Sequence, residues 1–511
     1  MNLSKTMSTG IHSVVSEGGQ SRRSSRRSSI LDLVASPTLQ DYTSSWKRSQ
    51  SFGHLDVSDL RETLSRKNSN RTELSIDEET SLISGRHPLN KYNYPESTIE
   101  EEDEDRLLSI GLSKSNNHQT ILNAINVLIG VGLLSLPLGL YLSGWILGIT
   151  FLSGAAFLTK YTAILLGRCT ERDPSLRSYN DIGKKVLGRK VNYAILLVFL
   201  IDLLGGAASL AILFVDSLSS FFPEVPSKVF RLVFGGVVVV FNFLPLNGLS
   251  FLSFIGILST SSVVVIVIIS GLLKSEAPGS IFQPEVTNFW PTSFVNVLIA
   301  YGIFLCPFGG HPVLVELYRD MRHPEEYSSC MDKTFSFTLV VNLFIGIFGF
   351  LMFGMNADSE ITRNIMLTEN YPKWIPTVVC VFMTLLPLSK TPLVLRPVIT
   401  AIDDLTFTET ELLNSPQGIL SPSTQVKRIF SRIAAVVIAI TLSVTFNSFS
   451  QVLAILGSFI CTTICIILPT TFYILLFKDE LSYKQKVGFK LVIVVFIILA
   501  ILGTIAAALY G

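Results

Sequence analysis

The sequence predicts an all-α polytopic membrane protein, with a disordered N-terminal tail over residues 1–106 and a membrane domain over residues 107–511. The chain has 511 residues, of which 49% are hydrophobic and 15% charged, whereas soluble globular proteins carry about 25% charged residues. Eleven apolar stretches follow the tail, each about long enough to cross a ~30 Å hydrocarbon core. Two of these stretches are interrupted in the middle by glycine and proline.

The tail is rich in serine, arginine and acidic residues and poor in aromatic ones. It cannot bury enough apolar surface to offset the entropy of ordering, so we expect it to be disordered. Residues 1–30 lack the apolar core of a signal peptide. Ser25 and Ser29 each lie in an Arg-Arg-Ser-Ser run, a pattern typical of basophilic kinase sites, where phosphate would reverse the local charge. A low-complexity basic patch explains the same residues equally well.

Two acidic dileucine patterns in this region suggest sorting adaptors as partners. One ends in Leu82-Ile83 and the other in Leu107-Leu108, each after a cluster of acidic residues. Such patterns also arise by chance, but two of them in a cytosolic tail indicate an endolysosomal or vacuolar destination.

The apolar stretches give the predicted spans, with two doubtful boundaries. The connectors 246–249 and 448–449 are so short that either neighbouring pair could be one helix, which would leave ten spans. The predicted spans are 118–140, 144–166, 191–216, 229–246, 250–273, 294–316, 333–354, 374–397, 428–447, 450–476 and 488–510.

The distribution of lysine and arginine favours eleven spans. If the N-terminus is cytosolic, the cytosolic connectors carry thirteen basic residues and the connectors on the far side carry four. Cytosolic loops are enriched in lysine and arginine. We therefore expect a cytosolic N-terminus and a C-terminus on the opposite, lumenal side.

The two interrupted spans are the first and the sixth. The first contains Gly130-Val131-Gly132, and the sixth contains Pro307-Phe308-Gly309-Gly310-His311-Pro312. Non-helical backbone at membrane depth survives where it is buried in protein or lines a cavity. Breaks that recur after five spans predict a 5+5 inverted repeat with broken helices 1 and 6 plus one extra helix. Paired breaks of this kind are the best sequence pointer to the binding site of a secondary transporter.

The chemistry of broken helices indicates a zwitterionic ligand. The half-helix after a break presents unpaired N–H groups and a positive dipole end, which suit a carboxylate. The half-helix before a break presents carbonyl groups, which suit an ammonium group. An amino acid carries both groups, so we expect an amino acid substrate. The alternative is that Gly130 and Gly132 only permit close helix packing.

Three ionisable residues inside the spans are candidates for carrying a coupling proton. Asp202 lies half-way along the third span, where a carboxylate is costly unless it is paired or hydrated. His311 lies in the second break and can titrate near neutral pH. Lys390 lies in the eighth span between two prolines. Each has a structural alternative: a buried ion pair or packing role for Asp202, a hydrogen bond to freed backbone for His311, and snorkelling for Lys390.

Several classes of function and site are not expected. The sequence has no nucleotide-binding glycine loop, no metal-spaced histidine cluster and no plausible serine triad, so we expect no enzyme, no metal and no cofactor. The six cysteines are scattered, which predicts free thiols. The net charge is +1, so no global field favours nucleic acid.

Four segments resemble the amino acid/auxin permease family, and within it the vacuolar amino acid transporters of fungi and plants. They are N-A-I-N-V-L-I-G-V-G-L-L-S-L-P at 123–137 followed by Gly144-Trp145, S-Y-N-D-I-G-K-K-V-L-G at 178–188, the segment 301–321 with Gly310-His311 and Tyr318, and L-P-L-S-K-T-P-L at 386–393. The resemblance covers about residues 115–510.

The resemblance implies the five-plus-five fold and exchange of lumenal protons for cytosolic neutral amino acids. It also implies the substrate-binding positions, namely Asn126, Gly130, Val131, Gly132 and Leu133 on one side and Phe304, Pro307, Phe308, Gly309 and Gly310 opposite. The chain departs from plant relatives at Cys306-Pro307-Phe308-Gly309, where they tend to be more polar.

The sequence therefore predicts a proton-coupled antiporter of neutral amino acids in a vacuolar or lysosome-like membrane, whose partners are the substrate, protons, membrane lipid, sorting adaptors and kinases. Two alternatives remain: a sodium- or proton-coupled plasma-membrane importer, and a non-transporting amino acid sensor.

Overall fold

The structure is a computed structural model that describes residues 115–509, apart from 174, 177, 245, 407–421 and 447. These residues belong to the larger of two compact units, Ser45–Gly511. The predictions for the tail and its boundary lie outside the described residues: the disorder of residues 1–106, the kinase sites Ser25 and Ser29, and the sorting positions Leu82, Ile83, Leu107 and Leu108.

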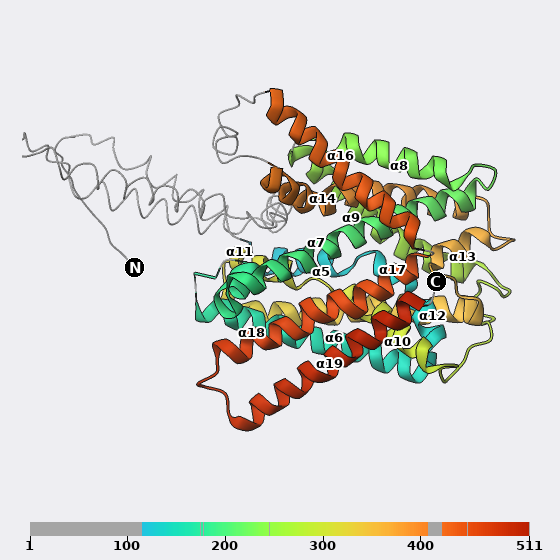
Figure 1. The fold of residues 1–511 in the computed structure, drawn as a ribbon. Helices are drawn as coiled ribbons and strands as arrows, with labels where there is room; N and C mark the ends of the chain where they lie inside the picture. The colour runs from blue at the N-terminus through green and yellow to red at the C-terminus, as the bar shows by residue number, and fades with distance from the viewer. Residues whose placement is uncertain are drawn as a thin grey trace, which may run out of the picture. The chain divides into compact units, whose positions relative to one another are not determined.

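The described chain is a bundle of helices (Figure 1). In chain order they are α5 (Asn117–Leu128), η1 (Val131–Ser135), α6 (Leu136–Arg172), α7 (Tyr179–Phe221), α8 (Ser227–Phe241), α9 (Leu246–Leu273), α10 (Phe294–Leu305), η2 (Cys306–Phe308), α11 (His311–Asp320), η3 (Pro324–Glu326), α12 (Tyr327–Phe353), η4 (Gly354–Asn356), α13 (Ile361–Leu367), α14 (Trp374–Thr406), α16 (Pro422–Thr445), α17 (Phe449–Ile455), η6 (Leu456–Ile467), α18 (Leu468–Leu476) and α19 (Tyr483–Leu509).

Within the described ranges, nine helices are long and apolar enough to cross a membrane. Two predicted spans fall outside that number for simple reasons. The first is divided between α5 and the helix that follows the break, and the fourth, α8, has only 15 residues. The predicted count of eleven and the inverted repeat therefore stay predictions. The all-helical membrane fold is confirmed.

The connector between the second and third predicted spans, residues 167–190, is helical over most of its length, because α6 continues to Arg172 and α7 begins at Tyr179. The start of α7 is set by a capping box, in which Ser178 and Asp181 accept hydrogen bonds from each other's backbone N–H groups. Gly188 then bends the helix with a φ of 82°. The polar composition of this segment concealed a helix that has its own capping signal.

Buried apolar side chains form two cores. The larger core gathers side chains from α5, α6, α10, α12 and the segment 449–476. The smaller core lies between α7, α8, α14 and α16. Both broken spans belong to the larger core, which sets where the candidate site can lie.

The tenth predicted span contains an unpredicted π-helical segment, η6, which packs against α10. Gly302 of α10 and Gly457 of η6 meet there backbone to backbone, and a Cβ added to either glycine would collide with the main chain of the partner segment. Glycines at such crossings let membrane helices approach closely.

The bend between the first two predicted spans is at Gly144, whose φ is 72° and ψ 170°. A Cβ at this position would lie 2.6 Å from the carbonyl oxygen of Phe289. The backbone groups of 145 and 146 donate to the same segment, since Trp145 N–H bonds the carbonyl of Asn288 and Ile146 N–H that of Phe289. The loop that precedes α10 is thus fastened to the start of the second span.

Gly144→Ala should lower stability by about 1–3 kcal/mol, because a side chain is strained at this φ and would press on the Phe289 main chain. The thermal unfolding midpoint of the detergent-solubilised protein measures this. Gly154→Ala is the matched control, since that glycine is exposed on the same α6 and a Cβ there meets nothing within 4 Å. Equal midpoints for the two variants would contradict the prediction.

Candidate functional site

The predicted break in the first span is present. α5 ends at Leu128, after which Ile129 leaves helical geometry and Gly130 is extended, with a φ of −107° and a ψ of −164°. A 3₁₀ turn, η1, then leads directly into α6. No side chain caps this new helix start, so its first N–H groups are available to a ligand.

The sixth predicted span is broken in the same way. α10 ends at Leu305, η2 forms one 3₁₀ turn, and Gly309 and Gly310 are both non-helical before α11 begins at His311. Pro312 lies in the first turn of α11, where its missing N–H costs little. The start of α11 also lacks a side-chain cap.

The two breaks touch each other. A Cβ added to Gly132 would lie 3.3 Å from Cγ of Pro307. A Cβ on Gly310 would lie 2.7 Å from Cγ1 of Val127, at the end of α5. At Gly130, by contrast, a Cβ would meet nothing within 4 Å. The glycines therefore bring the two main chains together and leave open space beside Gly130.

The other residues predicted to bind substrate lie around this contact in different environments. Leu133, Phe304 and Phe308 are fully buried, and Phe308 stacks on Phe335 of α12. Asn126 and Val131 are half-buried, whereas Gly309 is exposed. The structure thus brings the breaks together but commits the larger side chains to packing.

His311 is completely buried and ties α11 to α6. Its Nε2 lies 2.9 Å from Oγ1 of Thr162 and 3.1 Å from the carbonyl oxygen of Thr159. A carbonyl can only accept, so Nε2 carries the proton and donates to Thr159. Nδ1 is buried and has no hydrogen-bond partner among the described residues. The ring therefore holds the backbone immediately after the second break.

The remaining two proton-coupling candidates lie in different places. Asp202 of α7 is half-buried. Its helix packs against η6, and Cys461 of η6 lies against Gly309 of the second break. Lys390 of α14 lies with its methylene chain against Gly256 of α9. Neither residue forms an ion pair with any other described residue.

Sequence reasoning missed a polar stripe on α12. Thr334, Thr338 and Asn342 are completely buried, and their spacing of four puts them on one face of the helix. Both threonine hydroxyls and both amide atoms of Asn342 lack a hydrogen-bond partner within the described part of the chain. Buried polar groups are normally hydrogen-bonded, so these atoms form a polar face that can hydrogen-bond to a ligand or to water.

The stripe faces the first break. Near the start of α12, Glu326 accepts a hydrogen bond from the Asn117 side chain, and near its end a Cβ on Gly349 would collide with Pro137. α12 therefore runs alongside the first span in the same direction, and it packs against both α5 and η1. When residues are counted along both segments between these two contacts, Thr338 and Asn342 come to lie opposite the break. The spacing of polar residues in an apolar stretch was the signal available in the sequence.

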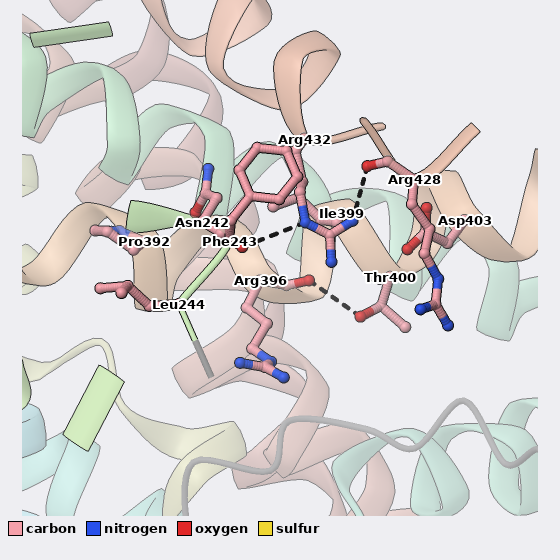
Figure 2. A pocket seen from close by; sticks show the side chains of 10 residues that line it. All are labelled: Asn242, Phe243, Leu244, Pro392, Arg396, Ile399, Thr400, Asp403, Arg428 and Arg432. Carbon is pink, nitrogen blue, oxygen red and sulfur yellow. Dashed lines mark hydrogen bonds between the residues drawn. The ribbon is translucent and has the colours of Figure 1, made fainter. Parts of the chain in front are cut away.

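A cavity of about 300 Å³ lies elsewhere, between α14, α16 and the segment that follows α8 (Figure 2). Arginines dominate its polar lining. Arg432 is fixed by Nε donating to the carbonyl of Asn242 at 3.3 Å and Nη1 donating to that of Arg428 at 2.7 Å, while its guanidinium lies over the Phe243 ring. This cavity is separate from the paired breaks. Its lining residues are Asn242, Phe243, Leu244, Pro392, Arg396, Ile399, Thr400, Asp403, Arg428 and Arg432.

Known proteins similar to this chain are transporters by name. "Amino acid transporter AVT1E" of Arabidopsis thaliana is 26% identical over 76% of this chain and 72% of its own length. "Amino acid transporter AVT1H" of the same organism is 26% identical over 78% of this chain and 90% of its own length.

Among solved structures, the chain is similar to MHP1, a nucleobase-cation-symport-1 family transporter, with 14% identity over 78% of this chain and 91% of that one and a TM-score of 0.47. The profile of the family described as "Transmembrane amino acid transporter protein" matches residues 113–510. The matched region includes both breaks and every described helix. The chain therefore belongs to the transmembrane amino acid transporter family.

Proposed function

We propose that the chain exchanges protons for neutral amino acids across a vacuolar or lysosome-like membrane by alternating access about the paired breaks. The observation that carries this proposal is the contact between Gly132 and Pro307. It brings two uncapped helix starts and two helix ends to one place beside the open space at Gly130.

The polarity of these ends suits the backbone of an amino acid. The starts of η1 and α11 present N–H groups and positive dipole ends to a carboxylate, and the ends of α5 and α10 present carbonyls to an ammonium group. The stripe on α12 adds the unpartnered amide of Asn342 on the same side as the first break. The apolar surroundings, with Phe304, Phe308 and Leu133 buried nearby, favour uncharged side chains.

Coupling and topology complete the proposal. Asp202 carries the coupling proton, because it is an acid on the helix that packs against η6, next to the second break, and has no basic partner among the described residues. His311 has a positional role, because its protonated nitrogen is already engaged by Thr159.

The eleven spans form a 5+5 inverted repeat plus one, with a cytosolic N-terminus and a lumenal C-terminus. Thirteen basic residues on one side against four on the other support this orientation.

Purified full-length protein in liposomes should take up labelled neutral amino acids when the vesicle interior is acidic. A protonophore should abolish the uptake, and a sodium gradient without a pH difference should not drive it. Radiotracer accumulation measures all three conditions, with empty liposomes as the control. Uptake driven only by sodium would establish the plasma-membrane importer instead, and no uptake under any gradient would favour a sensor.

Asn342→Leu should reduce uptake by tenfold or more while leaving the thermal midpoint unchanged or raised. The reason is that removing an unsatisfied buried polar group is neutral or stabilising for the fold but removes a hydrogen-bonding group from the substrate space. Ser336→Ala, at an exposed position of the same helix, is the matched control and should leave uptake intact. A large fall in the midpoint with normal specific transport would show that Asn342 is structural.

Asp202→Asn should abolish gradient-driven uptake but preserve counterflow, which is exchange of labelled for unlabelled substrate without a gradient. The amide cannot carry the proton, while the substrate site is unchanged. His311→Gln should keep gradient-driven uptake, because an amide N–H can replace the donor to Thr159. The opposite pattern, in which the Gln variant alone loses the response to pH, would assign the proton to His311.

A further inference from the structure

Glu360 is a buried acid that the proposed mechanism does not use. It immediately precedes α13, in the connection between α12 and α14. Its side chain is completely buried, and neither carboxylate oxygen has a hydrogen-bond partner among the described residues. An isolated ionised carboxylate is very costly in such a place and normally becomes protonated instead.

The neighbouring charges do not compensate the negative charge that Glu360 would carry if it were ionised. Burial raises the pKa of Glu360 well above its usual range, the Asp216 carboxylate of α7 raises it further, Arg363 opposes the rise, and Asp358 adds to it. Arg363 is itself engaged with Asp358, at 3.4 Å from Nη1 to Oδ2. The combined effect of burial and two neighbouring acids on the pKa of Glu360 is therefore larger than the opposing effect of Arg363, whose charge is shared with Asp358.

The elements packed on α13, which are η1, α7, α9 and α14, bring few further charges. Beyond them, the positive charge of Arg231 in α8 acts on the Asp216 carboxyl. Lys274, at the end of α9, donates to the carbonyl of Glu369, beyond the far end of α13. η1 has no ionisable residue, and the first charged residue of α14 is Lys390, 16 positions into that helix. Asp216 of α7 is thus the neighbouring acid whose charge acts most strongly on Glu360.

α13 also covers the first break. It packs against η1, α7, α9 and α14. The hydroxyl of Ser135, the last residue of η1, donates to the carbonyl of Ser359, which is the neighbour of Glu360. A Cβ on Gly349 of α12 would lie 2.5 Å from Cδ1 of Ile361. Figure 1 shows α13 with the loops at the end of the bundle where the described chain finishes. Movement of α13 away from η1 would carry Glu360 out of its buried position.

We propose that Glu360, paired with Asp216, is a proton-binding site that couples closure of α13 over the first break to the uptake of a proton. The neutral form of Glu360 is stable when α13 is closed over the first break. The charged form requires contact with water, and hence requires α13 to open. The proposal rests on the proposed function, because it supplies the gate through which protons on one side control access to the same site.

The direction of the pH effect follows from the two states. With the cover open, Glu360 is hydrated and has an ordinary carboxyl pKa, and with the cover closed its pKa is raised. Closure is therefore favoured below the ordinary carboxyl range and is lost as the pH rises through the raised value. In the predicted topology α13 is lumenal, so an acidic lumen closes the lumenal side and favours the cytosol-facing state.

Hydrogen–deuterium exchange of peptides that span 354–368 tests this directly in the full-length protein. After correction for intrinsic exchange, the opening constant of α13 in the unmodified protein should rise with pH by up to about tenfold per pH unit, the limit for one proton. In Glu360→Gln it should stay low and flat, because the amide mimics the neutral acid. Glu369→Gln, an exposed acid just beyond α13, should behave as the unmodified protein.

A second variant keeps the test decisive if Glu360→Gln does not fold. Asp216→Asn removes a charge that raises the pKa of Glu360, so the rise of the opening constant with pH should level off at a lower pH and be smaller in total than in the unmodified protein. Opening that is independent of pH in the unmodified protein, or unchanged in Asp216→Asn, overturns the proposal. Hydrogen–deuterium exchange reports only the opening of α13. The proposal for Glu360 can therefore fail while proton-driven uptake is observed, and it can hold while proton-driven uptake is not observed.

Discussion

The structure depends on the rule that backbone polar groups inside hydrocarbon must be satisfied within the protein. Regular helices satisfy the rule without help, so every departure from helical geometry needs a local reason. At the two breaks the departure brings neighbouring segments together, because Gly132 lies against Pro307 and Gly310 against Val127, and a side chain at either glycine would crowd the contact. The freed groups of the two breaks lie close together, where Gly132 meets Pro307.

His311 illustrates how a bent segment is kept in place. The helix that starts at this residue has no side-chain cap, and a proline in its first turn removes one backbone donor. The ring replaces those links by bonding across to α6, where Thr159 and Thr162 lie one turn apart. A single buried side chain therefore fixes the direction in which α11 leaves the break.

Much of the fold followed from the sequence, because glycine, proline and long apolar stretches carry strong local constraints. Both breaks lie where the sequence predicted them, and the predicted spans fall on helices, although several helices extend well beyond the predicted ends. The sequence did not reveal α13, since seven residues are too few for a periodic pattern, or η6, whose residues are ordinary apolar ones. The roles of Asn342 and Glu360 depend on which distant segments cover them, and no spacing along the chain encodes that.

The crossing of Gly302 with Gly457 has a mechanical consequence. With backbone against backbone, α10 and η6 cannot slide past each other without a steric clash. The half-helix before the second break is therefore pinned to the tenth span, while the half-helix after it is held by α6. Gly309 and Gly310 therefore join two half-helices that are anchored to different parts of the bundle.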